Sequence, residues 1–232
     1  MINMNKHYCF TDVHGNYNLW RQVADYCDDT DVIYFLGDAA DRGEDGLQII
    51  QELLRDKRVV YLKGNHEDIF VDVGAELAEG IGWSASLWRE NGGKHTINSF
   101  KRLSYDSQIY YIKRLAQLPT KAEYVNTKGQ TIIMTHAGFT PGRPVKPVDL
   151  IWDRKHINHE WPQDEQYKDT YIVHGHSPVQ ILFKSDNPVY YCDGHKIDLD
   201  MATFVTNKIA LLDLDTLEIE KIFEDKTPKE ED

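Results

Sequence analysis

The stretch Val32-Ile33-Tyr34-Phe35-Leu36-Gly37-Asp38-Ala39-Ala40-Asp41-Arg42-Gly43 decides the fold of this 232-residue chain. Its first five residues are apolar and run directly into a glycine and a carboxylate, which is typical of a buried strand that ends in a polar loop. The loop pattern Gly-Asp-x-x-Asp-Arg-Gly fixes five residues, each at roughly 6% abundance, so chance produces it about once per million positions. We therefore interpret the loop as part of a functional site.

Four other apolar runs end in the same kind of polar cluster. They are His7–Phe10 before Asp12 and His14, Val59–Leu62 before Asn65 and His66, Thr131–Met134 before His136, and Tyr171–Val173 before His174 and His176. Short runs of this kind are typical of the buried strands of an α/β sheet. Such sheets place their sites just past the carboxyl ends of the strands, so we expect these polar side chains to lie together.

The segments between the strands have helical periodicity. Residues 16–27 and 46–55 each place apolar side chains on one face of a helix. Residues 67–118 are also mostly helical in pattern, with glycine interruptions and no strand-like run. We interpret residues 67–118 as a helical insertion within a single domain of residues 1–223.

The C-terminal part of the chain is predicted to complete a sheet. Residues 189–191, 202–205 and 209–212 have the composition of strands, and we expect them to be antiparallel. Residues 224–232 contain five acids, two lysines and a proline, with almost nothing apolar to bury. We expect them to be a disordered tail.

Composition and charge exclude several classes of protein. An apolar content of 41% is too high for a disordered chain, and the net charge of −12 opposes binding to a nucleic-acid backbone or an anionic membrane. Three widely spaced cysteines fit neither a disulfide scaffold nor a zinc finger, and they suit a reducing compartment. The first residues lack the apolar segment of a signal peptide, and no apolar run approaches the ~20 residues of a membrane helix. We therefore expect a cytoplasmic protein.

The polar clusters contain the ligand types of a two-metal centre. Six residues offer oxygen or nitrogen donors, namely Asp12, His14, Asp38, Asn65, His136 and His176. Asp12 and His14, separated by one residue after a strand, can bind one cation, and Asp38 can bridge two. Two divalent ions outweigh the two carboxylates by two positive charges, which a bridging hydroxide and a phosphate can supply. Such a centre hydrolyses phosphoesters.

Other residues of these clusters can bind the phosphate and donate a proton. Arg42 offers a planar donor fork for phosphate oxygens, and Arg154 is a second candidate clamp, with Arg143 as its rival. His66 can protonate the leaving oxygen as a general acid, with Asp41 orienting its imidazole.

The five polar clusters together resemble the phosphoprotein-phosphatase branch of the calcineurin-like metallophosphoesterases. The resemblance covers about residues 7 to 215 and is greatest to the short bacterial and phage-type members, whose insertion is similar to the Trp88-Arg89-Glu90-Asn91-Gly92-Gly93 segment. It implies a four-layer α/β/β/α sandwich of two mixed sheets with a helical insertion. Thr11 and Ala137 depart from glycines that many members carry, without removing a ligand.

The resemblance also implies roles for individual residues. Asp12, His14 and Asp38 match the ligands of one metal ion, and Asp38, Asn65, His136 and His176 match those of the other. His66 and Asp41 match the catalytic acid pair, while Arg42 and Arg154, with Asn65, match the groups that contact the phosphate. Manganese is the expected metal, and iron or zinc would suit the same donors.

Several residues have two interpretations. His174 can be a ligand, or it can orient a neighbouring residue or pack in the core. Glu67 can pair with Arg42 or simply begin a helix. Trp83 and Trp88 sit in helical patterns and are expected in the core.

The sequence thus predicts a dinuclear metal-dependent phosphomonoester hydrolase. We expect a metal-bridging hydroxide as nucleophile, His66 as general acid, and phosphoserine, phosphothreonine or phosphotyrosine in proteins, or a small phosphoester, as substrate. The alternative is a dinucleoside polyphosphate hydrolase of the diadenosine tetraphosphate type, because such enzymes share the signature. A non-catalytic binding module is opposed by the complete set of ligands. Nothing in the sequence indicates the oligomeric state.

Overall fold

The computed structural model describes residues 5–227, and its first sheet is built around three parallel strands that follow one another along the chain. The sheet order is β10 (Glu218–Glu224), β9 (Lys208–Asp213), β1 (His7–Phe10), β2 (Val32–Phe35) and β3 (Val59–Tyr61). β1 pairs with β2, and β2 with β3, in parallel, whereas β9 is antiparallel to β1, and β10 is antiparallel to β9.

The second sheet has the same mixed character. The sheet order is β4 (Lys121–Val125), β5 (Thr131–Thr135), β6 (Thr170–His174), β8 (Lys196–Asp198) and β7 (Val189–Tyr191). β5, β6 and β8 are parallel neighbours, and β4 and β7 are antiparallel strands at the two edges. The parallel strands are neighbours in each sheet, at one side of the first and in the middle of the second, so their carboxyl ends lie along one edge of each sheet.

Alternate residues of the strands pack into two separate apolar cores. In β1, Cys9 lies in the core between the sheets, together with Met134 and Val173 of the second sheet. Its neighbours Tyr8 and Phe10 pack on the opposite face, against helices. This period of two follows from the pleat of the strand and places the two sheets face to face.

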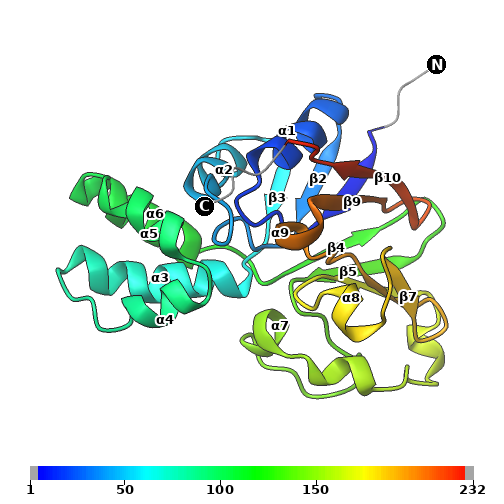
Figure 1. Ribbon diagram of the computed structural model, residues 1–232. Coiled ribbons are helices and arrows are strands. Elements are labelled where there is room, and N and C mark those ends of the chain that lie inside the picture. Colours follow the sequence, from blue (N-terminus) through cyan, green and yellow to red (C-terminus); the bar gives the residue numbers. More distant parts are fainter. Residues whose placement is uncertain (1–4, 228–232) are drawn as a thin grey trace.

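Helices cover the outer faces of both sheets (Figure 1). α1 (Tyr17–Tyr26) and α2 (Gly46–Leu53) cover the first sheet, and α1 begins where the Asn16 side chain accepts a hydrogen bond from the amide of Leu19. Shorter helices, α7 (Asp149–Trp152) and α8 (Val179–Leu182), lie beside the second sheet, with 3-10 turns at Lys155–Asn158 and Glu165–Tyr167. The predicted α/β/β/α sandwich of two mixed sheets is confirmed.

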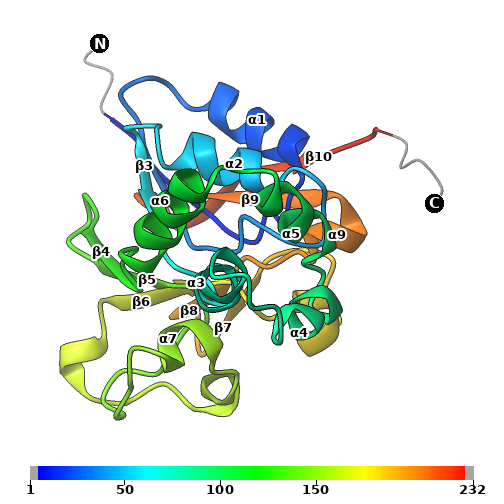
Figure 2. The same ribbon diagram turned by 90° about the vertical axis from the view of Figure 1, so that its left-hand side faces the viewer.

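Four helices occupy the segment expected to be an insertion, and they project from one side of the sheets (Figures 1 and 2). They are α3 (Asn65–Ala78), α4 (Ala85–Glu90), α5 (Lys94–Lys101) and α6 (Tyr105–Ala116). Phe70, Trp88 and Phe100 of this segment belong to the same apolar core as α1 and α2. The insertion is therefore packed onto the first sheet rather than folded apart from it.

Two expectations about local structure are wrong. Residues 202–205 do not form a strand, because Ala202 and Asn207 both adopt left-handed backbone conformations that bracket one helical turn, α9 (Thr203–Thr206). Trp83 does not lie in the core; its side chain is 89% exposed in the connection between α3 and α4.

The C-terminal boundary also differs from the expected one. Glu224 is the last residue of β10, and the amide of Asp225 donates to the carbonyl of Asn207, so the expected tail begins inside a paired strand. Residues 228–232 of that tail lie outside the described residues. Between residues 5 and 227, no helix combines the length and the apolar character needed to span a bilayer.

Candidate metal centre and active site

The loops at the carboxyl ends of the two sheets are bonded to one another. His136 Nδ1, from the second sheet, lies 3.0 Å from the carbonyl oxygen of Leu36 in the first. The amide of His176 donates to Asp12 Oδ2 over 3.1 Å, again across the two sheets. These contacts bring together residues that are far apart in the sequence.

Two adjoining groups of donor side chains share Asp38, and they contain the expected ligands His14, His136 and His176 together with His66, which is expected to be the general acid rather than a ligand. His14, Asp38 and His66 have donor atoms within 4.8 Å of one another, and so do Asp38, His136 and His176. His14 Nε2 lies 3.7 Å from both Asp12 Oδ1 and Asp38 Oδ2. These separations are too long for hydrogen bonds and leave the donor atoms facing a common space.

The donor atoms fit a pair of divalent cations. His176 Nε2 is buried and has no hydrogen-bond partner within residues 5–227, which is costly unless another group satisfies it. Asn65 Oδ1 lies 2.9 Å from His136 Nε2 and 2.8 Å from His176 Nδ1, so the amide oxygen faces the same centre. Carboxylate, amide and imidazole donors are the ligands that manganese, iron and zinc accept.

The buried side chains of the two donor groups differ in charge: His14 and His176 are neutral, whereas Asp38 is ionised. Burial, together with His66 and Arg42, holds the pKa of His14 well below its ordinary value, and burial lowers the pKa of His176 to about 2. Both rings are therefore neutral, the form that binds a metal. Burial opposes ionisation of Asp38, but His136 and His66 outweigh it and hold its pKa well below the ordinary value.

Strained backbone is concentrated at the site. Outside glycine, left-handed conformations with φ between 44° and 70° occur at six of the expected site residues, namely Asp12, His14, Asp38, Asp41, Arg42 and His176. Aspartate tolerates this region better than most residues, yet each instance has a cost. The surrounding hydrogen bonds must therefore hold these loops in place.

Glu67 supplies part of that support. Its carboxylate accepts hydrogen bonds from the amides of Asp38, Ala39 and Gly64, each at 2.8 Å, and from the hydroxyl of Tyr61 at 2.9 Å. No hydrogen bond or ion pair with Arg42 is found among the described residues, and Glu67 lies in the first turn of α3, which favours the second of its two interpretations. Glu67 instead anchors the loop that carries Asp38.

His66, which belongs to the first donor group, forms a buried pair with Asp41. His66 Nδ1 lies 2.7 Å from Asp41 Oδ2, and Nε2 points toward Asp38 Oδ2 at 3.8 Å. Burial opposes protonation of the ring, but Asp38 and Asp41 outweigh it and raise the pKa of His66. A protonated imidazole held in this way can donate a proton.

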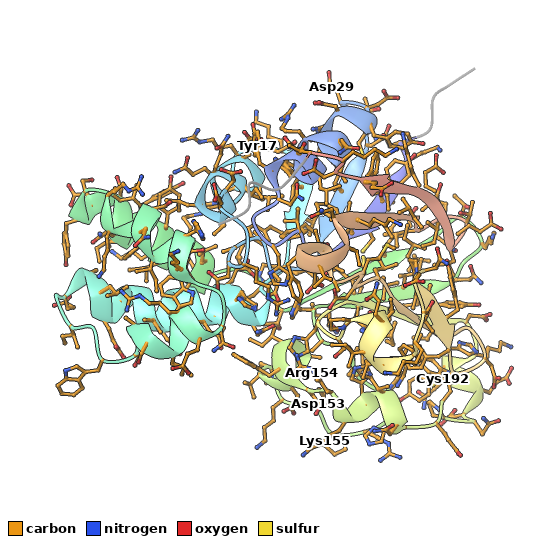
Figure 3. All side chains as sticks on the ribbon, viewed as in Figure 1. Tyr17, Asp29, Asp153, Arg154, Lys155 and Cys192 are labelled. Atoms are coloured by element: carbon orange, nitrogen blue, oxygen red, sulfur yellow. The ribbon has the colours of Figure 1, made fainter. Side chains whose placement is uncertain are left out.

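The two candidate arginine clamps reach the rim of the site. Arg42 is exposed, and its guanidinium lies 4.0 Å from the ring centroid of Phe204. Arg154, in the segment after α7 (Figure 3), donates to the carbonyl of His176 at 3.3 Å. Its rival Arg143 lines a separate pocket of about 220 Å³ with His156 and other residues. The contact with His176 favours Arg154 over Arg143.

His174 does not face the donor groups. Its Nδ1 lies 3.0 Å from the carbonyl oxygen of Gly175, and its Nε2 lies 2.7 Å from the hydroxyl of Tyr191. Both ring nitrogens are thus engaged, which favours the role of orienting the loop before His176.

A pocket of about 450 Å³ opens beside the metal centre. His14, Arg42 and Phe204 are among its lining residues, and the Phe204 ring lies against the other two side chains. Three acidic residues, Glu44, Asp45 and Asp225, also line it. A substrate that reaches the donor groups through this pocket passes an aromatic ring and several carboxylates.

Comparison with known proteins places the chain in a family. The model of the calcineurin-like phosphoesterases matches residues 6–205. The chain is 25% identical over 165 residues to a bis(5'-nucleosyl)-tetraphosphatase of Oceanobacillus iheyensis, covering 63% of this chain and 62% of that protein, just under two thirds of its length. It is 26% identical over 154 residues to serine/threonine-protein phosphatase 2 of Salmonella typhimurium, covering 63% and 66% of the two chains.

Solved structures share the fold. A putative diadenosine tetraphosphatase superposes with a TM-score of 0.59 at 16% identity, covering 94% of each chain. A protein serine/threonine phosphatase from Saccharomyces cerevisiae also gives 0.59, at 12% identity, over 97% of this chain and 81% of that one. The match of the family model over most of the chain shows that the chain belongs to the calcineurin-like phosphoesterase family.

Proposed function

We propose that the enzyme hydrolyses phosphomonoesters of serine and threonine side chains in proteins, with phosphotyrosine as a further substrate. The observation that carries the proposal is the buried Asp41–His66 pair, whose imidazole belongs to the first donor group. A serine or threonine alkoxide is a poor leaving group and requires a proton as the ester bond breaks. A nucleotide leaves as a stable phosphate anion and has less need of a general acid.

Each residue of the site has a separate role in the proposed reaction. When bound by Asp12, His14 and Asp38 and by Asp38, Asn65, His136 and His176, two divalent ions supply Lewis acidity and an activated water. We propose manganese, with iron or zinc as alternatives. Arg42 and Arg154, with the amide of Asn65, hold the phosphate oxygens, and His66 protonates the leaving oxygen. Asp41 holds the His66 ring in position.

The proposal includes a cytoplasmic location and no nucleic-acid or membrane partner. Cys9, Cys27 and Cys192 are all free thiols, which suits a reducing compartment. The net charge of −12 opposes association with polyanions.

A second candidate is hydrolysis of dinucleoside polyphosphates. One similar protein is named a bis(5'-nucleosyl)-tetraphosphatase, which favours this candidate. The Phe204 ring that lines the pocket also favours it, because an aromatic ring can stack on a base. The carboxylates of Glu44, Asp45 and Asp225 oppose it, because they would repel a chain of phosphates.

A substrate panel decides between the two candidates. Manganese-loaded enzyme is assayed with phosphoserine, phosphothreonine and phosphotyrosine peptides and with diadenosine tetraphosphate, with and without EDTA. We expect inorganic phosphate to be released from the phosphoserine and phosphothreonine peptides, and EDTA to abolish the release. Faster cleavage of diadenosine tetraphosphate would replace the proposal by the second candidate. Absence of turnover on every peptide with any divalent metal would refute it.

A further inference from the structure

We infer that Trp88, on helix α4 of the insertion, is a positioning residue for the Asp41–His66 pair; the inference rests on the proposed role of His66. The indole Nε1 of Trp88 donates to Asp41 Oδ2 over 2.8 Å. The same oxygen lies 2.7 Å from His66 Nδ1. Trp88 and Asp41 are both fully buried, so this contact is shielded from water.

The carboxylate of Asp41 needs such a partner. Its other oxygen, Oδ1, is buried without a hydrogen-bond partner among the described residues. The terminal torsion of an aspartate is broad and roughly two-fold, so hydrogen bonds rather than the torsion itself select the orientation. Two contacts on a single oxygen, from Trp88 and His66, therefore determine the orientation of the carboxylate plane.

The same segment of the insertion also holds the backbone of the Asp41 loop. The amide of Asp41 donates to Thr96 Oγ1 over 3.1 Å, and the amide of Arg42 donates to the carbonyl of Gly92 over 2.8 Å. Both loop residues have left-handed backbones, with φ of 69° and 66°. Residues 88–96 thus contact the strained loop at three points, one of which is the Trp88 side chain.

An indole suits this position because it can only donate. It cannot accept the His66 proton, and it stays a donor across the pH range in which enzymes work. A hydroxyl at the same place could rotate and act as an acceptor. Trp88 therefore fixes Asp41 Oδ2 as an acceptor without entering the proton transfer.

The test compares two substrates that differ in their need for a general acid. Trp88→Phe keeps an aromatic ring but removes the N–H group. We expect its kcat on a phosphoserine peptide to fall by about 10- to 100-fold, the usual effect of losing a residue that orients a catalytic group. Its kcat on p-nitrophenyl phosphate, which has a good leaving group, should change little. Trp83→Phe, at an exposed tryptophan of the same insertion, should leave both rates unchanged.

A double-mutant cycle tests whether Trp88 acts through Asp41. In an Asp41→Ala background, Trp88→Phe should cause no further loss on the phosphoserine peptide. A further loss there, or an equal loss on both substrates in the single variant, would overturn the inference. Thr96→Val, which removes the acceptor of the Asp41 amide, should show the same selective loss and serves if Trp88→Phe does not fold.

A measurement independent of activity separates this inference from the proposed function. The indole N–H signal of Trp88, assigned in the NMR spectrum by its absence in Trp88→Phe, should exchange slowly with solvent and shift strongly in Asp41→Ala. A signal that Asp41→Ala leaves in place overturns the inference even if the enzyme hydrolyses peptides. If the shift occurs but wild-type enzyme hydrolyses neither substrate, the contact stands and the proposed function fails.

Discussion

Glu67 accepts four hydrogen bonds although it faces neither group of donor atoms. Three of them come from backbone amides that flank Asp38 and the start of α3, so one side chain fixes the relation between two loops. A carboxylate is required because every partner is a donor. The position of Asp38 therefore depends on a residue with no chemical role of its own.

Glu67→Gln should loosen this arrangement. The amide group of glutamine turns one acceptor into a donor that faces a backbone N–H, and a buried unsatisfied group costs about 1–3 kcal/mol. We expect urea unfolding to show that loss in the free energy of unfolding, and elemental analysis to show fewer bound metal ions. Glu123→Gln, at an exposed surface glutamate, is the matched control. Unchanged stability and metal content in Glu67→Gln would contradict this account.

At the scale of single residues, the sequence predicts which residues meet at the site better than it predicts which residues hold them in position. Residues such as Asp12 and His136 directly follow strands, so the pattern of strands already indicates that they meet. The partners of Glu67 and Trp88 depend on how distant loops come together, and no local pattern carries that information. Trp88 was expected simply to be a core residue, and its N–H finds Asp41 only because α4 packs across the loop.

At the scale of elements, the helical insertion contacts the site at two places, the start of α3 and the turn between α4 and α5. α3 begins with Asn65 and His66 in its first turn, and the turn between α4 and α5 passes over Trp88. A Cβ atom at Gly93 would lie 2.2 Å from Trp88 Cδ1, a distance that no packed side chain tolerates. The glycine allows the chain to pass directly over the indole.

Gly93→Ala should therefore disturb both packing and catalysis. Overpacking of this kind costs about 1–3 kcal/mol, and it displaces the indole from Asp41. We expect a lower melting temperature, together with a larger loss of kcat on a phosphoserine peptide than on p-nitrophenyl phosphate. Gly82→Ala, where the nearest atom to an added Cβ is Leu77 Cδ2 at 3.9 Å, should have neither effect. Equal melting temperatures for the two variants would contradict the packing argument.

Helices and strands with clear apolar periodicity were predictable, and three strands in which charged residues interrupt or replace the apolar run were not. The strands that precede the site and the helices of residues 67–118 follow from their patterns. Strands β4, β8 and β10 each contain charged residues, and β8 even buries Lys196, whose ammonium group donates to Thr140 and to the carbonyl of His156. Tertiary partners, rather than local preference, make these segments strands.

At the scale of the whole molecule, buried histidines link stability to pH. Burial, with a contribution from His174, lowers the pKa of His156 from 6.5 to about 2. The folded protein therefore keeps this ring neutral, whereas the unfolded chain binds a proton below pH 6.5. Stability is fully present above that pH and is lost as the pH falls toward 2.

His156→Gln should reduce the sensitivity of the fold to acid. One proton taken up only by the unfolded chain gives a slope of about 1.4 kcal/mol per pH unit. We expect the free energy of unfolding, measured with urea at pH 7, 6 and 5, to fall less steeply in the variant than in the wild type. The variant will be less stable at pH 7 if it packs poorly, but its slope should still be lower. Parallel slopes would contradict a neutral buried ring.

The position of β1 also orders events during synthesis. β1 precedes the other strands of the first sheet along the described chain, and β9, which covers one of its edges, follows β2 and β3. A nascent chain that stops at residue 205 lacks that cover and exposes an open strand edge next to Asp12. The first sheet can therefore be completed only after all the candidate site residues, from Asp12 to His176, have already been synthesised.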